Sequence, residues 1–113
     1  MTVGDFLESK AKARQIVTYQ DVITAFPHLP ELQGNWNAHP LARIFEALDQ
    51  EDAQKGRPFR TSLVVKKDEN NKMPGNGFFE ALERLKGVTC RNDAARQSAW
   101  ITELNGAHQF PWP

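Results

Sequence analysis

The side chains best suited to chemistry in this chain are basic and amide groups around the segment from 55 to 72. Arginine, lysine and asparagine all donate hydrogen bonds to phosphate oxygens, and such contacts weaken with salt because condensed counterions are released on binding. A solvated loop with charged edges is the structural alternative. With one arginine from the preceding helix, the candidate nucleic-acid contacts are Arg43, Arg57, Arg60, Lys66, Lys67, Asn70, Asn71 and Lys72.

A second group of charges is acidic and lies toward the end of the predicted third helix. Its members are Glu46, Asp49, Glu51 and Asp52. These carboxylates would repel phosphates within the ~10 Å range of screened electrostatics. They would attract a basic protein such as a nuclease or toxin, because charge complementarity raises association rate and specificity. The two groups therefore support two hypotheses, a nucleic-acid-binding module and a protein-binding inhibitor such as an immunity protein, antitoxin or phage-encoded antagonist.

The other reactive residues form no recognisable catalytic or metal-binding pattern. The three histidines and the single cysteine, Cys90, are scattered without zinc-site spacing. Glu80 and Glu83 share a helical face, but Arg84 and Lys86 beside them favour an ordinary solvated surface. No glycine-rich phosphate-binding motif is present. We therefore expect a non-catalytic protein with no cofactor and no metal.

Capping signals and apolar spacing predict the first helices. Capping-box pairs at Thr2/Asp5 and Thr18/Asp21 open helices that end near Arg14 and at Pro27, with a brief strand at 16–17 between them. A third helix begins with Asn37 or His39 as cap and Pro40 in its first turn, and it ends at Gly56. Its predicted core stripe is Leu41, Ile44, Phe45 and Leu48.

The second half of the chain is predicted as a strand, a polar loop and two helices. Apolar residues from Thr61 to Lys67 favour a strand, and the Pro-Gly-Asn-Gly run at 74–77 favours a turn back. A helix over 79–86 ends at Gly87 in a left-handed cap. A last helix begins at 92 or 93 and ends at 105–106. The apolar tail 105–113 either docks on its own domain or contacts a partner.

The stretch from about 16 to 87 resembles the winged-helix domain of DNA alkyltransferases and alkyltransferase-like proteins. Thr18-Tyr19-Gln20-Asp21 is similar to the family's Thr-Tyr-Gly-Asp motif, and Pro58-Phe59-Arg60 with Leu63-Val64-Val65 is similar to its Pro-Cys-His-Arg-Val-Val strand. The resemblance implies a recognition helix at 40–48 followed by a wing. Phe59 stands where the family has its nucleophilic cysteine, so the resemblance implies no alkyl transfer here.

Length and composition define the general class. The 113 residues predict a single domain over 1–113, with a core at about 3–104 and an α+β, winged-helix-like fold of about five short helices and a two- or three-stranded sheet or wing. Lysine plus arginine equals aspartate plus glutamate at 14 each, so only a local patch can provide charge-driven binding. One cysteine and the absence of a signal-peptide pattern or long apolar run predict a cytoplasmic protein without a membrane span. Its oligomeric state is left open.

Overall fold

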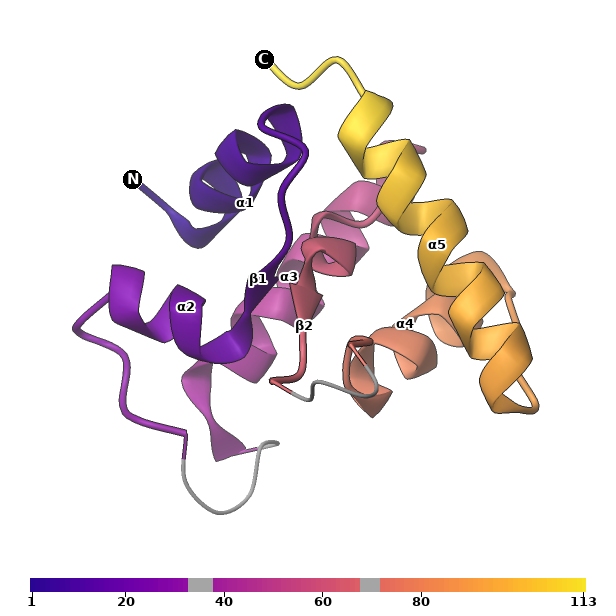
Figure 1. The fold of residues 1–113 in the computed structure, drawn as a ribbon, viewed down its shortest axis with the longest axis horizontal. Coiled ribbons are helices and arrows are strands. Elements are labelled where there is room, and N and C mark those ends of the chain that lie inside the picture. Colours follow the sequence, from indigo (N-terminus) through magenta and orange to yellow (C-terminus); the bar gives the residue numbers. More distant parts are fainter. Residues whose placement is uncertain (33–37, 68–71) are drawn as a thin grey trace.

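The computed structural model describes residues 1–32, 38–67 and 72–113, which form a compact α+β fold (Figure 1). A two-stranded parallel sheet joins the N-terminal half of the chain to its centre. The elements within these ranges are α1 (Val3–Lys12), β1 (Val17–Thr18), α2 (Tyr19–Ala25), α3 (Pro40–Gln54), the 3-10 helix η2 (Arg60–Leu63), β2 (Val64–Val65), α4 (Asn76–Lys86) and α5 (Asp93–Gln109).

The predicted starts of the first three helices are confirmed by their cap geometry. The hydroxyls of Thr2 and Thr18 each accept a hydrogen bond from the backbone N–H three residues on. The carboxylates of Asp5 and Asp21 accept in turn from the backbone N–H of Thr2 and Thr18, which completes two capping boxes. His39 caps α3, with its Nδ1 accepting from the backbone N–H of Leu41 at 3.0 Å. Local hydrogen bonding therefore decided these boundaries.

The strand predicted over 61–67 is wrong in extent. Only Val64 and Val65 are extended and paired, in register with Val17 and Thr18, while the residues before them form η2. The neighbouring strand β1 offers two residues, so longer pairing has no partner within the described ranges. The loop after β2 is closed by a hydrogen bond from the backbone N–H of Lys66 to the carbonyl oxygen of Met73, at 2.9 Å.

Two predicted boundaries also move around glycines. α4 begins at Asn76, inside the predicted turn, and it ends at Gly87 in the expected left-handed conformation with φ of 71°. α5 continues through Gly106 to Gln109. A Cβ at Gly106 would lie 3.1 Å from Cγ of Pro58, so close packing explains the glycine better than a helix stop does. The tail therefore begins at Phe110.

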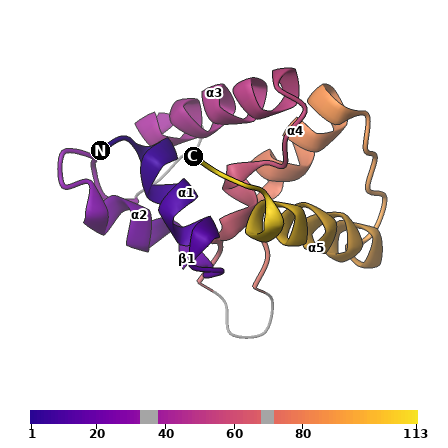
Figure 2. The ribbon, with the colours of Figure 1, turned by 90° about the horizontal axis from the view of Figure 1, so that it is seen from above.

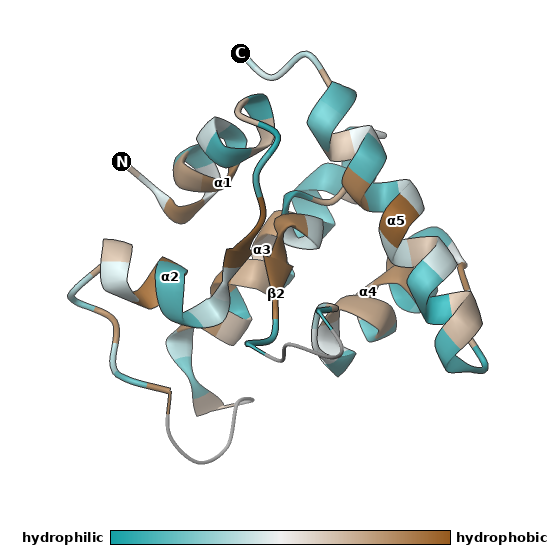
Figure 3. Cartoon of the chain, viewed as in Figure 1, coloured by the Kyte–Doolittle hydropathy of each residue, from teal (hydrophilic) through white to brown (hydrophobic). Residues whose placement is uncertain are grey.

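The segment η2–β2 runs through the centre of the fold, where it contacts α1, α3 and α5 (Figure 2). The paired strands β1 and β2 lie there too, and their residues include strongly apolar ones (Figure 3). One core cluster joins α1, α2, α3, both strands and the tail around Leu7, Val22 and Leu41. A second, around Phe59 and Leu82, joins α4 to the centre. Within the described ranges, no helix has the length and apolar character needed to cross a membrane.

Candidate functional site

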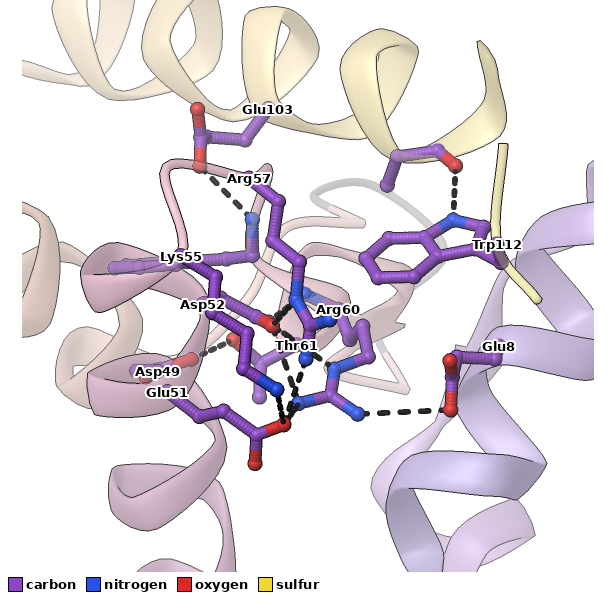
Figure 4. A network of polar contacts seen from close by, with 12 residues as sticks. Glu8, Asp49, Glu51, Asp52, Lys55, Arg57, Arg60, Thr61, Glu103 and Trp112 are labelled. Carbon is purple, nitrogen blue, oxygen red and sulfur yellow. Dashed lines mark hydrogen bonds and ion pairs between the residues drawn. The ribbon is translucent and has the colours of Figure 1, made fainter. Parts of the chain in front are cut away.

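The ion pairs of residues 51–60 centre on a buried aspartate, and they use residues that the sequence assigned to two opposing surfaces. Asp52 is fully buried, and Nε of Arg57 donates to its Oδ1 at 2.6 Å (Figure 4). The Nε of Arg60 donates to both Asp52 oxygens, at 3.1 and 3.2 Å, and the Arg60 backbone N–H donates to Oδ2 at 2.9 Å. We call Glu51, Asp52, Arg57 and Arg60 the Asp52 cluster.

Further contacts hold both arginines in place. Nη1 of Arg60 lies 3.6 Å from Oε2 of Glu8 on α1. The guanidinium carbons of Arg57 and Arg60 lie 5.3 and 5.9 Å from the ring of Trp112 in the tail. Burial opposes the charge of Arg57, but the hydrogen bond and charge of Asp52 outweigh it and raise the pKa of Arg57. The cluster thus connects α1, α3, η2 and the tail.

The structure therefore buries Arg60, Asp49 and Asp52 and encloses most of the Arg57 side chain. The side chain of Arg57 is 13% exposed, and Arg60 is buried within the central segment. Asp52 and Asp49 are 0% and 3% exposed. Buried ion pairs of this kind are costly to break, because the remaining charge is left unpaired in the interior.

A signal for this burial is present in the helix spacing. Leu41, Phe45, Asp49 and Asp52 are the buried residues of α3 and follow one another at helical intervals of four, four and three. The two aspartates continue the apolar stripe, so they point inward with it. The predicted acidic surface included both aspartates, although their spacing continues the apolar stripe.

Asp49 is a buried carboxyl group with a different environment. Its Oδ1 accepts a hydrogen bond of 2.6 Å from the hydroxyl of Thr61 in η2. Burial raises the pKa of Asp49 to about 7, an effect that the Thr61 hydrogen bond and the charges of Arg84 and Lys86 only partly offset. The nearby charge of Asp52 contributes to this rise. Asp49 is therefore close to half-protonated near neutral pH.

Asp49 and Thr61 form part of the wall of a cleft of about 700 Å³, a volume in the range typical of ligand sites. Exposed basic side chains reach it from three elements: Arg43 on α3, Lys66 after β2, and Arg84 on α4. The acidic groups Glu46 and Glu80 also line it. The remaining lining residues are Tyr19, Leu32, Ala42, Phe45, Gly75, Asn76, Gly77, Phe78 and Ala81.

An aromatic wall of the cleft is held by a backbone contact. The hydroxyl of Tyr19 accepts a hydrogen bond of 2.8 Å from the N–H of Gly75, just before α4. The ring of Tyr19 lies 5.9 Å from that of Phe45 on α3. Burial raises the pKa of the Tyr19 hydroxyl, so it stays neutral at physiological pH. The ring is thereby fixed between α3 and α4.

The structure brings together only part of the predicted basic set. Arg43 and Lys66 share the cleft, and Lys67 and Lys72 are exposed at the two sides of the loop that follows β2. Asn70 and Asn71 lie outside the described residues. Arg84 was missed, although Gly77, Ala81 and Arg84 repeat at helical intervals and mark the cleft face of α4.

The predicted acidic set is divided more severely. Glu46 is exposed in the cleft. Glu51 is 44% exposed on its side chain, but Lys55 lies 3.2 Å and Arg57 2.8 Å from its Oε1. With Asp49 and Asp52 buried, Glu46 is the one member of this set that is exposed without an ion pair in the described structure.

Among the residues that the structure describes, no group of three or more histidine, cysteine, aspartate or glutamate side chains could hold a metal ion. Cys90 is a free thiol, half-buried against the second core cluster.

Comparison of the chain with protein-family models, with curated proteins and with solved structures returned no significant match.

Proposed function

We propose that this chain is a small non-catalytic binding module that contacts nucleic acid through the cleft between α3 and α4 and the lysines beside it. The observation that carries the proposal is the meeting of Arg43, Lys66 and Arg84, from three separate elements, in one cleft. Lys67 and Lys72 extend the basic surface along the adjoining loop. Such side chains bind phosphate oxygens by charge-assisted hydrogen bonds.

We also propose that this surface is built as a winged helix. A helix, α3, is followed by the central segment, the short strand β2 and a loop closed between Lys66 and Met73. In this arrangement the loop is the wing, and its exposed lysines contact the phosphate backbone. Its contribution is independent of base sequence, because phosphates carry no sequence information directly.

The protein-binding alternative has less support. It requires a concentrated acidic surface, whereas Asp49 and Asp52 are buried and Glu51 is paired with neighbouring cations. Glu46 remains, and it lies beside the basic residues of the cleft. An attractive field for a basic nuclease or toxin needs several unpaired carboxylates on one face.

A salt-titrated binding assay tests the proposed function. A labelled oligonucleotide is followed by fluorescence anisotropy with the wild-type chain and with the double variant Lys66→Glu and Lys67→Glu. We expect the variant to lose binding, or to bind at least about tenfold more weakly with a salt slope lowered by about 2. Arg91→Glu is the matched control, because Arg91 is exposed and lies outside the cleft lining. Equal affinity of wild type and double variant would contradict the proposal.

A further inference from the structure

The charged groups of the cleft come from different segments of the chain that line it. Arg43 and Glu46 come from α3, Glu80 and Arg84 come from α4, and Lys66 stands where β2 ends. The two helices also pack against each other directly. The outward polar face of α3 is therefore one side of a concave surface, with α4 as the other side.

This geometry does not suit reading of a DNA duplex by α3. A recognition helix lies inside the major groove, which is about 12 Å wide and accepts one helix with its side chains. For Arg43 of α3 to reach base edges in that way, the duplex would have to enter a cleft that is bounded by α4. A helix that projects from the protein surface can enter the major groove and contact base edges. A helix that forms one wall of a cleft can contact only a ligand narrow enough to enter that cleft.

A single strand is such a ligand. Proteins that bind unpaired strands combine a basic groove for the backbone with aromatic rings on which bases stack. The cleft has three exposed cations and, in Tyr19, a half-buried ring whose hydroxyl is anchored to Gly75. Its volume of about 700 Å³ suits nucleotide-sized groups.

We infer that the cleft between α3 and α4 binds a segment of single-stranded nucleic acid, with Arg43, Lys66 and Arg84 on its phosphates and the ring of Tyr19 against a base. This inference rests on the proposed function and adds that the bound nucleic acid is single-stranded. Glu46 and Glu80 restrict where phosphates can pass, because carboxylates repel them. The phosphate backbone of the bound strand therefore follows the cations, and a base lies on the Tyr19 side of the cleft.

The test compares one labelled oligodeoxynucleotide of mixed sequence as a single strand and as a duplex with its complement, in the same low-salt buffer. We expect the single strand to bind at least about tenfold more tightly. Arg84→Glu should weaken single-strand binding about tenfold or more, whereas Arg91→Glu should leave it unchanged. Circular dichroism of each variant checks that the fold is retained.

Two substitutions of the aromatic residue test the stacking contact separately. Tyr19→Ala should weaken single-strand binding about tenfold, while Tyr19→Phe, which keeps the ring and loses the hydroxyl with its hydrogen bond to Gly75, should lose clearly less affinity than Tyr19→Ala. Equal or tighter binding of the duplex overturns the inference and leaves the proposed function standing. Absence of binding to either form overturns both. Equal loss in Tyr19→Phe and Tyr19→Ala overturns the role of the ring.

Discussion

The side chain of Arg60 lies against the carboxylate of Asp52 inside the fold, with Nε 3.1 Å from Oδ1 and 3.2 Å from Oδ2. The backbone N–H of Arg60 donates to the same carboxylate, at 2.9 Å. The pair therefore fixes both the backbone and the side chain of η2 to α3. Nη2 of Arg60 has no hydrogen-bond partner among the described residues, and its contacts with Asp52 and Glu51 are electrostatic only.

Removing the Asp52 carboxylate should strongly destabilise the protein. Asp52→Ala removes the buried carboxylate that pairs with both Arg57 and Arg60, and leaves them only Glu8 and the partly exposed Glu51 as counter-charges. Loss of a buried partner of this kind costs about 3–5 kcal/mol of unfolding free energy. Glu46→Ala removes an exposed carboxylate from the same helix and should cost less than about 0.5 kcal/mol. Urea denaturation followed by far-UV circular dichroism measures both. Similar midpoints for the two variants would show that the buried pair contributes little.

Gly4 should resist a substitution that normally stabilises helices. Glycine to alanine inside a helix commonly gains about 0.5–1 kcal/mol. A Cβ at Gly4 would lie 2.8 Å from Nη1 of Arg60 and 3.2 Å from Cδ2 of Leu48, and Arg60 is held by Asp52. We expect Gly4→Ala to destabilise the protein by about 1–3 kcal/mol. Ser9→Ala, on the exposed side of the same helix, is the control, and a more stable Gly4→Ala variant would contradict the expectation.

The tail should contribute to folding stability. Trp112 is 6% exposed, and its indole N–H donates to the carbonyl oxygen of Ala107 at 2.8 Å. Trp112→Ala should lower the unfolding free energy by about 3–5 kcal/mol, because a buried indole and its contact with the two arginines are lost. Pro113→Ala changes an exposed residue and should have little effect. Thermal unfolding compares them, and coincident transitions would indicate an undocked tail.

Stability should fall as the pH rises through the titration range of Asp49. Its pKa is about 7 in the folded chain against 3.8 for an ordinary aspartate, so between these values the folded state keeps a proton that the unfolded state releases. Stability therefore decreases from about pH 4 to about pH 7, and the full shift corresponds to about 4 kcal/mol. Asp52, Thr61, Arg84 and Lys86 are the groups that act on this carboxyl.

Asp49→Asn isolates this effect. Asparagine has no titrating proton, and its oxygen can still accept from Thr61. We expect the variant to be more stable than the wild type at about pH 8 and to show a flatter dependence on pH from about pH 5 upward. The lowered pKa values of Asp5 and Glu51 contribute stability that is already present in this window. Parallel pH profiles for wild type and variant would contradict the assignment.

The helices were predictable from the sequence because their signals are local. Thr2/Asp5 and Thr18/Asp21 are read within one helical turn, and Gly87 requires only its own backbone conformation. The apolar stripe of α3 likewise predicts which side faces the core. These features depend on neighbours along the chain, so no tertiary information is needed to find them.

Only the tertiary structure decided which charges are available to a partner. In the sequence, Arg57 and Arg60 belong to the same basic segment as Lys66 and Lys67. In the structure the two arginines are enclosed with Asp52, whereas the two lysines are exposed. The short sheet, η2 and the cleft likewise arise from contacts between distant segments. Charge and capping are properties of a residue and its near neighbours, whereas burial and pairing depend on which parts of the chain meet, and only the folded structure determines that.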